Sequence, residues 1–253
     1  MIISNPSPNL IRNKKIIIAD VDETICESCQ LVSDEMAEVI SNLVTRGYEF
    51  AFISGTGLKS LQRMISSKLN NKHHILATTG TNYALMNNKE EEKIYNHSLS
   101  IEEKKEIIKA FDKLITNFNI QSMTSKEDQV QDRESQITLS AIGRHAPKEL
   151  KATYDPEGRI RQGWVEFLEK DLGNKYDIKI GGTTSVDITK KGLDKEWGIR
   201  KFLKHHNINP ESVIFFGDKL YPGGNDLPAS NVVDCISVKN PKETLDKLKE
   251  LFP

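Results

Sequence analysis

The 253-residue sequence has little cysteine, no strong excess of charge of either sign and no long hydrophobic run. Its 35 basic and 36 acidic residues give a formal net charge of −1, so no overall field attracts nucleic acid or an anionic membrane. The longest apolar stretches, such as residues 15–19, are far too short to cross a bilayer. Residues 1–15 show neither an extended hydrophobic segment nor a small-residue cleavage site, so we expect no signal peptide. We therefore predict a cytoplasmic protein with no nucleic-acid or membrane partner.

The three cysteines are too few, and odd in number, for a disulfide scaffold. Cys26 and Cys29 form a CxxC motif, which suggests a redox motif or half of a zinc site. A structural zinc needs four ligands, however, and the sequence contains no second CxxC or CxxH. We interpret both as reduced cysteines in a loop.

Apolar and amphipathic segments alternate in the first third of the sequence. Short β-branched or apolar runs at residues 15–19, 49–53 and 75–77 are typical of buried strands. Helical patterns at residues 33–47 and 58–69 separate them, and the first is stopped by a glycine. Strand and helix alternating at this spacing predict a parallel sheet covered by helices.

This pattern is interrupted by a segment rich in Lys, Glu and Asn. It contains a long helix that begins with a capping box, Ser100 to Glu103, and an alternating stretch at residues 136–142. After this segment the first pattern resumes, with predicted helices at residues 195–204 and 241–251 and predicted strands at residues 213–216 and 232–238. The sequence thus predicts an α/β protein with a parallel-sheet core from residues 1–82 and 187–253. Residues 83–186 form an inserted α+β cap.

Polar residues follow the predicted core strands where each strand ends. In parallel α/β sheets, ligands bind beyond the carboxyl ends of the strands. Several carboxylates, a lysine and hydroxyl groups at that edge are the composition of a site for Mg²⁺ and phosphate. The candidates are Asp20, Asp22, Thr24, Ser54, Gly55, Lys195, Asp218, Asn225 and Asp226.

The motifs DVDET (20–24), Ser54, Lys195 and GD…ND (217–226) resemble the four motifs of the haloacid-dehalogenase superfamily. The inserted cap is similar to its class with a large α+β cap, type IIB. GDKLYPGGND (217–226) resembles the eukaryotic-type phosphomannomutases more closely, as do SAIGR (140–144), GGTTSVDI (181–188) and GLDK (192–195). The resemblance runs from residue 17 to about residue 244.

This resemblance implies a mechanism with Mg²⁺ as cofactor. Asp20 would be the nucleophile that forms an aspartyl phosphate, and Asp22 the general acid and base. Mg²⁺ would be held by Asp20, Asp218 and the backbone carbonyl of Asp22, with Asp226 acting through water. Thr24, Ser54, Gly55, Lys195 and Asn225 would contact the phosphoryl group or, for Asn225, orient Lys195.

In the cap, the resemblance implies that five residues bind the sugar phosphate: Arg133, Arg144, Lys151, Ser185 and Asp187. Lys151 and Cys29 stand at positions where the family has arginine. Glu23 and Ser54 stand where it usually has glycine.

Three functions remain open at this stage. The first is a phosphomannomutase-like phosphotransferase that interconverts hexose 6- and 1-phosphates, with a hexose bisphosphate as activator. The second is a Mg²⁺-dependent sugar-phosphate phosphatase, and the third is a non-catalytic sugar-phosphate binding module. The resemblance further implies a homodimer formed through the cap.

Overall fold

The computed structural model describes residue 2, residue 11 and residues 13–253. Most of the segment for which we expected no signal peptide lies outside these residues. The chain divides into two compact units. We call residues 1–96 and 194–253 the core unit and residues 97–193 the cap unit. No helix in the described part of the chain is both long and apolar enough to span a membrane.

The core unit contains a seven-stranded sheet with the order β11-β10-β1-β2-β3-β4-β5. Its strands are β1 (Ile16–Ala19), β2 (Glu49–Ile53), β3 (His73–Ala77), β4 (Asn82–Asn87), β5 (Glu90–Asn96), β10 (Val213–Gly217) and β11 (Asp234–Ser237). The five strands from β11 to β3 are parallel, and β4 and β5 are added antiparallel. The predicted α/β fold with a largely parallel core sheet is confirmed.

The hairpin formed by β4 and β5 belongs to the core sheet, so the inserted segment begins later in the chain than we predicted. We predicted the cap to span residues 83–186, whereas the compact cap unit spans residues 97–193. The reason is that β4 pairs with β3 and so extends the core sheet. The outer strand β5 has a charged, exposed sequence that resembles a loop.

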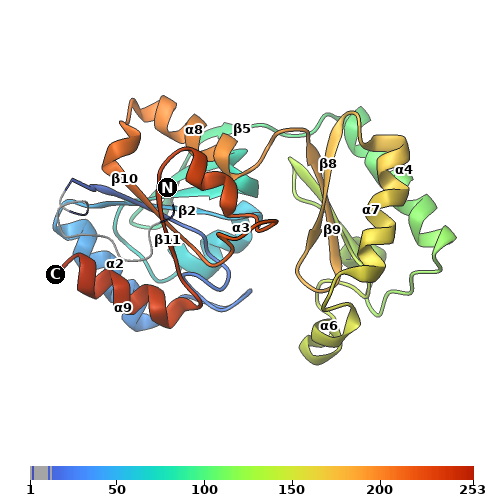
Figure 1. The fold of residues 1–253 in the computed structure, drawn as a ribbon, viewed down its shortest axis with the longest axis horizontal. Coiled ribbons are helices and arrows are strands. Elements are labelled where there is room, and N and C mark those ends of the chain that lie inside the picture. Colours follow the sequence, from blue (N-terminus) through green and yellow to red (C-terminus); the bar gives the residue numbers. More distant parts are fainter. Residues whose placement is uncertain (1, 3–10, 12) are drawn as a thin grey trace. The chain divides into compact units, whose positions relative to one another are not determined.

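Alternate residues of the core strands face opposite sides of the sheet, and each side is covered by helices. Ile17 and Ala19 pack with α2 (Asp34–Thr45), with α9 (Pro241–Leu251), and with α3 and the π-helix described next. Ile16 and Ile18 pack on the other side, against α8 (Lys195–His206). This arrangement leaves the carboxyl ends of the strands as the edge where polar residues can gather (Figure 1).

The remaining helices of the core unit are short or serve as connections. The predicted helix at 58–69 is an α-helix, α3 (Leu58–Leu61), that continues as a π-helix, η1 (Gln62–Ser66). The helix α8 spans Lys195–His206. Three 3₁₀ turns are η2 (Thr78–Gly80), η3 (Pro210–Ser212) and η4 (Leu227–Asn231).

The cap unit is a four-stranded antiparallel sheet with the order β6-β7-β9-β8. Its strands are β6 (Val130–Asp132), β7 (Gln136–Ser140), β8 (Tyr176–Gly181) and β9 (Ser185–Lys190). Its helices are α4 (Ile101–Asn117), α5 (Lys126–Gln129), α6 (Lys148–Tyr154) and α7 (Arg159–Leu172). The capping box of Ser100 and Glu103 is present at the start of α4, as predicted.

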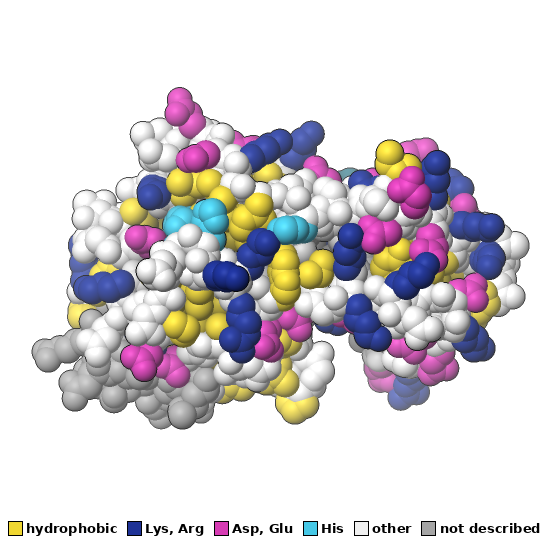
Figure 2. Space-filling model, turned by 90° about the horizontal axis from the view of Figure 1, so that it is seen from above, with side chains coloured by type: hydrophobic (Ala, Val, Ile, Leu, Met, Phe, Trp, Pro, Cys, Tyr) yellow, Lys and Arg dark blue, Asp and Glu magenta, His cyan; other side chains and the backbone are white. Residues whose placement is uncertain are grey.

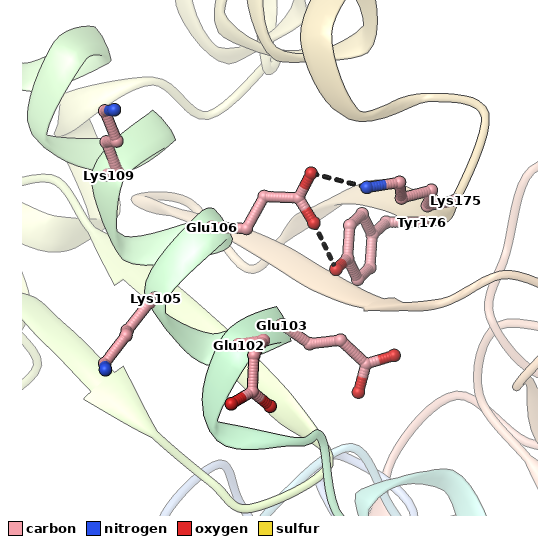
Figure 3. A pocket seen from close by; sticks show the side chains of 7 residues that line it. All are labelled: Glu102, Glu103, Lys105, Glu106, Lys109, Lys175 and Tyr176. Atoms are coloured by element: carbon pink, nitrogen blue, oxygen red, sulfur yellow. Dashed lines mark hydrogen bonds and ion pairs between the residues drawn. The ribbon is translucent and has the colours of Figure 1, made fainter.

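Helices α4 and α7 cover one face of the cap sheet with a separate hydrophobic core. Polar contacts also attach α4 to β8. Glu106 of α4 accepts hydrogen bonds from Lys175 Nζ (2.7 Å) and from the Tyr176 hydroxyl (2.8 Å), as Figure 3 shows. The pocket of about 880 Å³ beside these groups is lined by acidic and basic side chains and by Tyr176. On the face shown in Figure 2, basic and acidic side chains are interspersed.

Candidate active site

Three carboxylates gather at the carboxyl edge of the core sheet. Asp20 directly follows β1, and Asp218 directly follows the neighbouring strand β10. Asp226 is brought back to them by the loop after β10, and carboxylate oxygens of the three residues lie within 4.8 Å of one another. Asp20 and Asp226 are buried. The sequence predicted that these strand ends would converge, and the structure brings them together.

Lys195 supplies a buried positive charge to this cluster. It begins α8, and its Nζ lies 2.6 Å from Asp20 Oδ1 and 2.5 Å from Asp226 Oδ1. Burial alone would lower the pKa of Lys195, but the carboxylates of Asp20 and Asp226 outweigh burial and raise it. Lys195 therefore remains a cation.

The pKa of Asp20 moves in the opposite direction from that of an ordinary ion-paired carboxyl. Burial raises it, the neighbouring Lys195 lowers it, and Asp226 raises it again, to about 7. The single lysine charge thus does not compensate the acidic cluster. A buried carboxylate with incomplete compensation is the electrostatic signature of a functional group.

Asp22 is held by two hydroxyl groups from the loop after β2 and by a backbone N–H from its own loop. Its Oδ2 accepts hydrogen bonds from Ser54 Oγ and Thr56 Oγ1, both at 3.3 Å, and its Oδ1 accepts from the Cys29 backbone N–H at 3.0 Å. These donors fix the orientation of the Asp22 carboxylate, which contributes to raising the pKa of Asp20. The sequence predicted Ser54 but not Thr56, although a hydroxyl two residues after Ser54 was a visible signal.

The loop that follows Asp22 carries Glu23 and Cys29, two of the four residues that we expected to depart from the family's pattern. Glu23 has φ of 62°, a backbone conformation that favours glycine, and its carboxylate accepts a hydrogen bond from the Ser28 N–H at 3.0 Å. Cys29 is exposed and its thiol is free, whereas Cys26 is buried and also free. Burial raises the pKa of Cys26 to about 12, so this thiol is not a nucleophile.

The segment GDKLYPGGND folds back so that its two ends meet. The Lys219 N–H donates to Asp226 Oδ2 at 2.9 Å, and the Asp226 N–H donates to the Lys219 carbonyl at 3.3 Å. A Cβ on Gly217 would lie 2.6 Å from Asp226 Oδ2, and one on Gly224 would lie 2.0 Å from the Lys219 carbonyl oxygen. Both glycines are therefore required for this close return of the chain.

Other predicted core residues have different surroundings. Thr24 is fully buried, and its hydroxyl lies 3.4 Å from Asp218 Oδ1. Asn225 is exposed and, within residues 13–253, no hydrogen bond joins it to Lys195, which Asp226 holds instead. Gly55 is half-buried, with open space where a side chain would be.

Lys219 was not predicted as a site residue. Its Nζ lies 3.4 Å from Asp218 Oδ2. Burial would lower its pKa, but Asp218 and Asp20 outweigh this and raise it. It is a second cation beside the acidic cluster, and its position next to Asp218 in the sequence was the available signal.

The predicted cap residues form two groups within the cap unit. Gln131 Oε1 accepts hydrogen bonds from Arg133 Nη2 (3.0 Å) and Arg144 Nη1 (3.3 Å), so the two guanidinium groups converge. Lys151 Nζ donates to the Arg144 carbonyl at 2.8 Å. The second group consists of Ser185 and Asp187, which lie on β9.

The acidic cluster has the composition expected of a divalent-cation site. Three carboxylates face one fully buried lysine and the half-exposed Lys219, so negative charge is in excess at the sheet edge. Hard divalent cations prefer carboxylate oxygens of this kind. The residues present therefore fit a divalent metal.

The core sheet is largely parallel and carries an acidic cluster with a lysine at its carboxyl edge, and the chain contains an inserted α+β unit. Together these features define a class of α/β phosphoryl-transfer enzymes. Residues 17–229 match the family described as haloacid dehalogenase-like hydrolase. The chain belongs to this family, whose members use a divalent metal, and it is an enzyme of that family.

Among curated proteins, the chain is similar over nearly its whole length to phosphomannomutases. It is 26% identical to phosphomannomutase 1 of Dictyostelium discoideum, covering 94% of this chain and 96% of that protein. It is 27% identical to the phosphomannomutase of Spinacia oleracea, covering 94% of this chain and 95% of that protein.

Solved structures show the same fold at lower identity. The IMP-bound IMP-nucleotidase of Plasmodium falciparum has a TM-score of 0.72 at 18% identity, over 97% of this chain and 71% of that one. A Streptococcus mutans protein has a TM-score of 0.67 at 15% identity, over 94% of this chain and 99% of that one.

Proposed function

We propose that the protein is a Mg²⁺-dependent phosphotransferase of the phosphomannomutase type, which interconverts hexose 6- and 1-phosphates. The observation that carries this proposal is the cluster of Asp20, Asp218, Asp226 and Lys195 at the sheet edge, next to an Asp22 that is held by hydroxyl groups. Full-length similarity to phosphomannomutases supports the choice of a hexose phosphate.

In this proposal, Asp20 attacks the phosphorus of the substrate and forms an aspartyl phosphate. Lys195 stabilises negative charge on the transferring phosphoryl group, and Ser54 and Thr24 line the same position. Asp22 first gives a proton to the departing sugar oxygen and later removes one from the incoming hydroxyl. Its hydrogen bonds from Ser54, Thr56 and Cys29 keep that carboxyl oriented through both steps.

Asp20, Asp218 and the backbone carbonyl of Asp22 would hold Mg²⁺, with Asp226 close behind. When bound, the ion supplies charge neutralisation for the attacking carboxylate and the phosphoryl oxygens. Asp226 also keeps Lys195 at 2.5 Å, so it positions the lysine in addition to any role near the metal.

The cap residues are assigned to the sugar phosphate. Arg133 and Arg144 converge on one amide oxygen, and paired guanidinium groups are suited to gripping a phosphate. Lys151 adds charge without bidentate geometry, and Ser185 and Asp187 offer oxygen acceptors to the sugar. A hexose bisphosphate would serve as activator, and two copies would associate through the cap.

The alternative is a sugar-phosphate phosphatase. It is favoured by Ser54, which stands where the related mutases usually have glycine and which contacts Asp22. In that case Asp22 activates water instead of a sugar hydroxyl. A non-catalytic binding module is disfavoured because all four core side chains of the cluster are present.

One assay separates these functions. The protein is incubated with Mg²⁺ and a panel of hexose phosphates, with and without a hexose bisphosphate, and both isomers and inorganic phosphate are measured. Isomer formation from mannose 1-phosphate that the bisphosphate stimulates supports the mutase. Stoichiometric release of phosphate supports the phosphatase, and a protein that binds hexose phosphate without turnover contradicts both.

A further inference from the structure

The cap unit contains a buried cation that the mechanism above does not use. Arg161 lies in the first turn of α7 and is only 1% exposed. Its Nε donates to Asp155 Oδ2 at 2.9 Å, and its Nη2 donates to the Asp155 backbone carbonyl at 2.6 Å. Asp155 is itself 5% exposed, so this is a buried, charge-balanced pair.

The other arm of the guanidinium reaches the turn between β8 and β9. Arg161 Nη1 lies 2.8 Å from the carbonyl oxygens of Gly181 and Gly182 and 3.3 Å from that of Ser185. One planar group therefore ties the start of α7 to three carbonyls of a single turn. Lysine cannot reproduce this, because its ammonium is a single point of contact.

This turn carries the residues assigned to the sugar. Ser185 Oγ donates its proton to the Gly181 carbonyl at 2.8 Å, which leaves the lone pairs of the hydroxyl oxygen as acceptors. Asp187 lies two residues further along β9, on the same face of the strand. Its Oδ1 accepts a hydrogen bond from Thr138 Oγ1 at 2.7 Å, and its Oδ2 lies beside Gly181.

Gly181 allows both acceptor oxygens to approach the backbone of the turn closely. A Cβ at this position would lie 2.6 Å from Asp187 Oδ2 and 3.3 Å from Ser185 Oγ. The absence of a side chain at Gly181 thus lets the two acceptor oxygens lie side by side next to the turn. Such a pair suits a ligand that donates hydrogen bonds from neighbouring hydroxyl groups.

We propose that Arg161, neutralised by Asp155, is a positioning residue for substrate selection. It fixes the β8–β9 turn so that Ser185 Oγ and Asp187 Oδ2 accept hydrogen bonds from adjacent hydroxyls of the substrate's sugar ring. This inference rests on the proposed function, which assigns Ser185 and Asp187 to the sugar, and it adds Arg161 as the residue that holds these two acceptors in place.

The test compares two substrates in the full-length protein with Mg²⁺. Mannose 1-phosphate carries ring hydroxyls, whereas p-nitrophenyl phosphate carries none and reports on phosphoryl transfer at the core unit. In Arg161→Gln and Gly181→Ala, KM for the hexose phosphate should rise about tenfold or more. Turnover of p-nitrophenyl phosphate should stay within about twofold of wild type.

Two further variants sharpen the result. Arg161→Lys keeps the charge opposite Asp155 but loses the planar guanidinium that reaches several carbonyls at once. Its KM should therefore lie between those of wild type and Arg161→Gln. Arg159→Gln is the matched control, because Arg159 lies on the same helix, is exposed and pairs with the exposed Glu157. It should leave both substrates unaffected.

The inference would be overturned if Gly181→Ala and Arg161→Gln lost equal activity on both substrates and had a lower melting temperature. The contacts of Arg161 with the turn would then be only structural. Unchanged KM for the hexose phosphate in both variants would also overturn it. A wild-type protein that turns over p-nitrophenyl phosphate but no hexose phosphate would instead overturn the proposed function, and with it the sugar assignment.

Discussion

Lys195 in the core unit and Arg161 in the cap unit are both buried cations that pair with carboxylates, and the two arrangements differ in charge balance. In the core unit, Lys195 faces Asp20 and Asp226, with Asp218 close by, so negative charge is in excess. In the cap unit, Arg161 faces Asp155 alone, and the remaining contacts of its guanidinium are backbone carbonyls.

The two arrangements change carboxyl pKa values in opposite directions. Burial would raise the pKa of Asp155, but hydrogen bonds from the side chain and backbone of Arg161 outweigh burial and lower it. For Asp20, burial dominates over Lys195 and the pKa rises to about 7. A balanced pair stabilises its fold, whereas an unbalanced one is available to a metal ion and to a substrate.

The largest effect that tests this contrast is on activity. Asp20→Asn keeps the size of the side chain but removes the nucleophile, and it should lower turnover of any phosphate ester by about 10⁴-fold or more. Steady-state assays and trapping of the phosphoryl-enzyme check this. Residual turnover within tenfold of wild type would contradict the assignment of Asp20.

Breaking the Arg161–Asp155 pair of the cap unit should lower the free energy of unfolding. Asp155→Ala leaves the Arg161 charge buried without its partner, which typically costs about 3–5 kcal/mol. Denaturant unfolding of the full-length chain measures this loss. Glu157→Ala is the control, because Glu157 belongs to an exposed ion pair with Arg159 and should cost at most about 1 kcal/mol. Equal losses in the two variants would contradict the distinction.

The contrast between the two clusters was only partly visible in the sequence. The core carboxylates could be predicted because apolar strands end in them, and parallel strands bring those ends together. The contacts of Lys195 with both Asp20 and Asp226 could not, because they depend on how α8 packs. Arg161 was missed for a related reason: apart from Asp155, its partners include carbonyls about twenty residues away, which carry no side-chain signal.

The fold itself was more predictable than its boundaries. Alternating β-branched runs and amphipathic helices predicted the parallel sheet, and the capping box at Ser100 predicted the start of α4. The β4–β5 hairpin was assigned to the cap because β5 is an exposed edge strand rich in charge. Such strands lack the apolar alternation on which sequence prediction depends.

Metal binding at the core cluster should change the stability of the protein by an intermediate amount. Mg²⁺ at one hundred times its dissociation constant should stabilise the protein by about 2.7 kcal/mol, since it binds only the folded state. In Asp218→Asn this gain should disappear, while the metal-free variant should be at least as stable as wild type, because one of three crowded carboxylates is gone. Thermal unfolding with Mg²⁺ and with chelator checks both. Undiminished stabilisation of the variant would exclude Asp218 as a ligand.

The smallest effect is a pH dependence of opposite sign in the two clusters. In the folded, metal-free protein, Asp20 holds its proton up to about pH 7, whereas in the unfolded chain it loses it near 3.8. Between these values the folded state binds more protons, so the Asp20 contribution to stability increases as the pH falls. We expect about 1–2 kcal/mol between pH 7.5 and 5.5. The lowered pKa of Asp155 gives stability that is lost only below its unfolded value, outside this window.

Two histidines, His73, which is buried, and His206, which is exposed, act against Asp20 in the same window, and the experiment must separate them. Desolvation lowers the pKa values of His73 and His206, so as the pH falls below about 6.5 these residues take up fewer protons in the folded chain than in the unfolded chain. Their contribution therefore decreases as the pH falls. The Asp20 contribution is the difference between wild type and Asp20→Asn in chelator, since both carry the same histidines. If this difference stays flat between pH 7.5 and 5.5, Asp20 is ionised throughout and the core cluster is as well balanced as the cap pair.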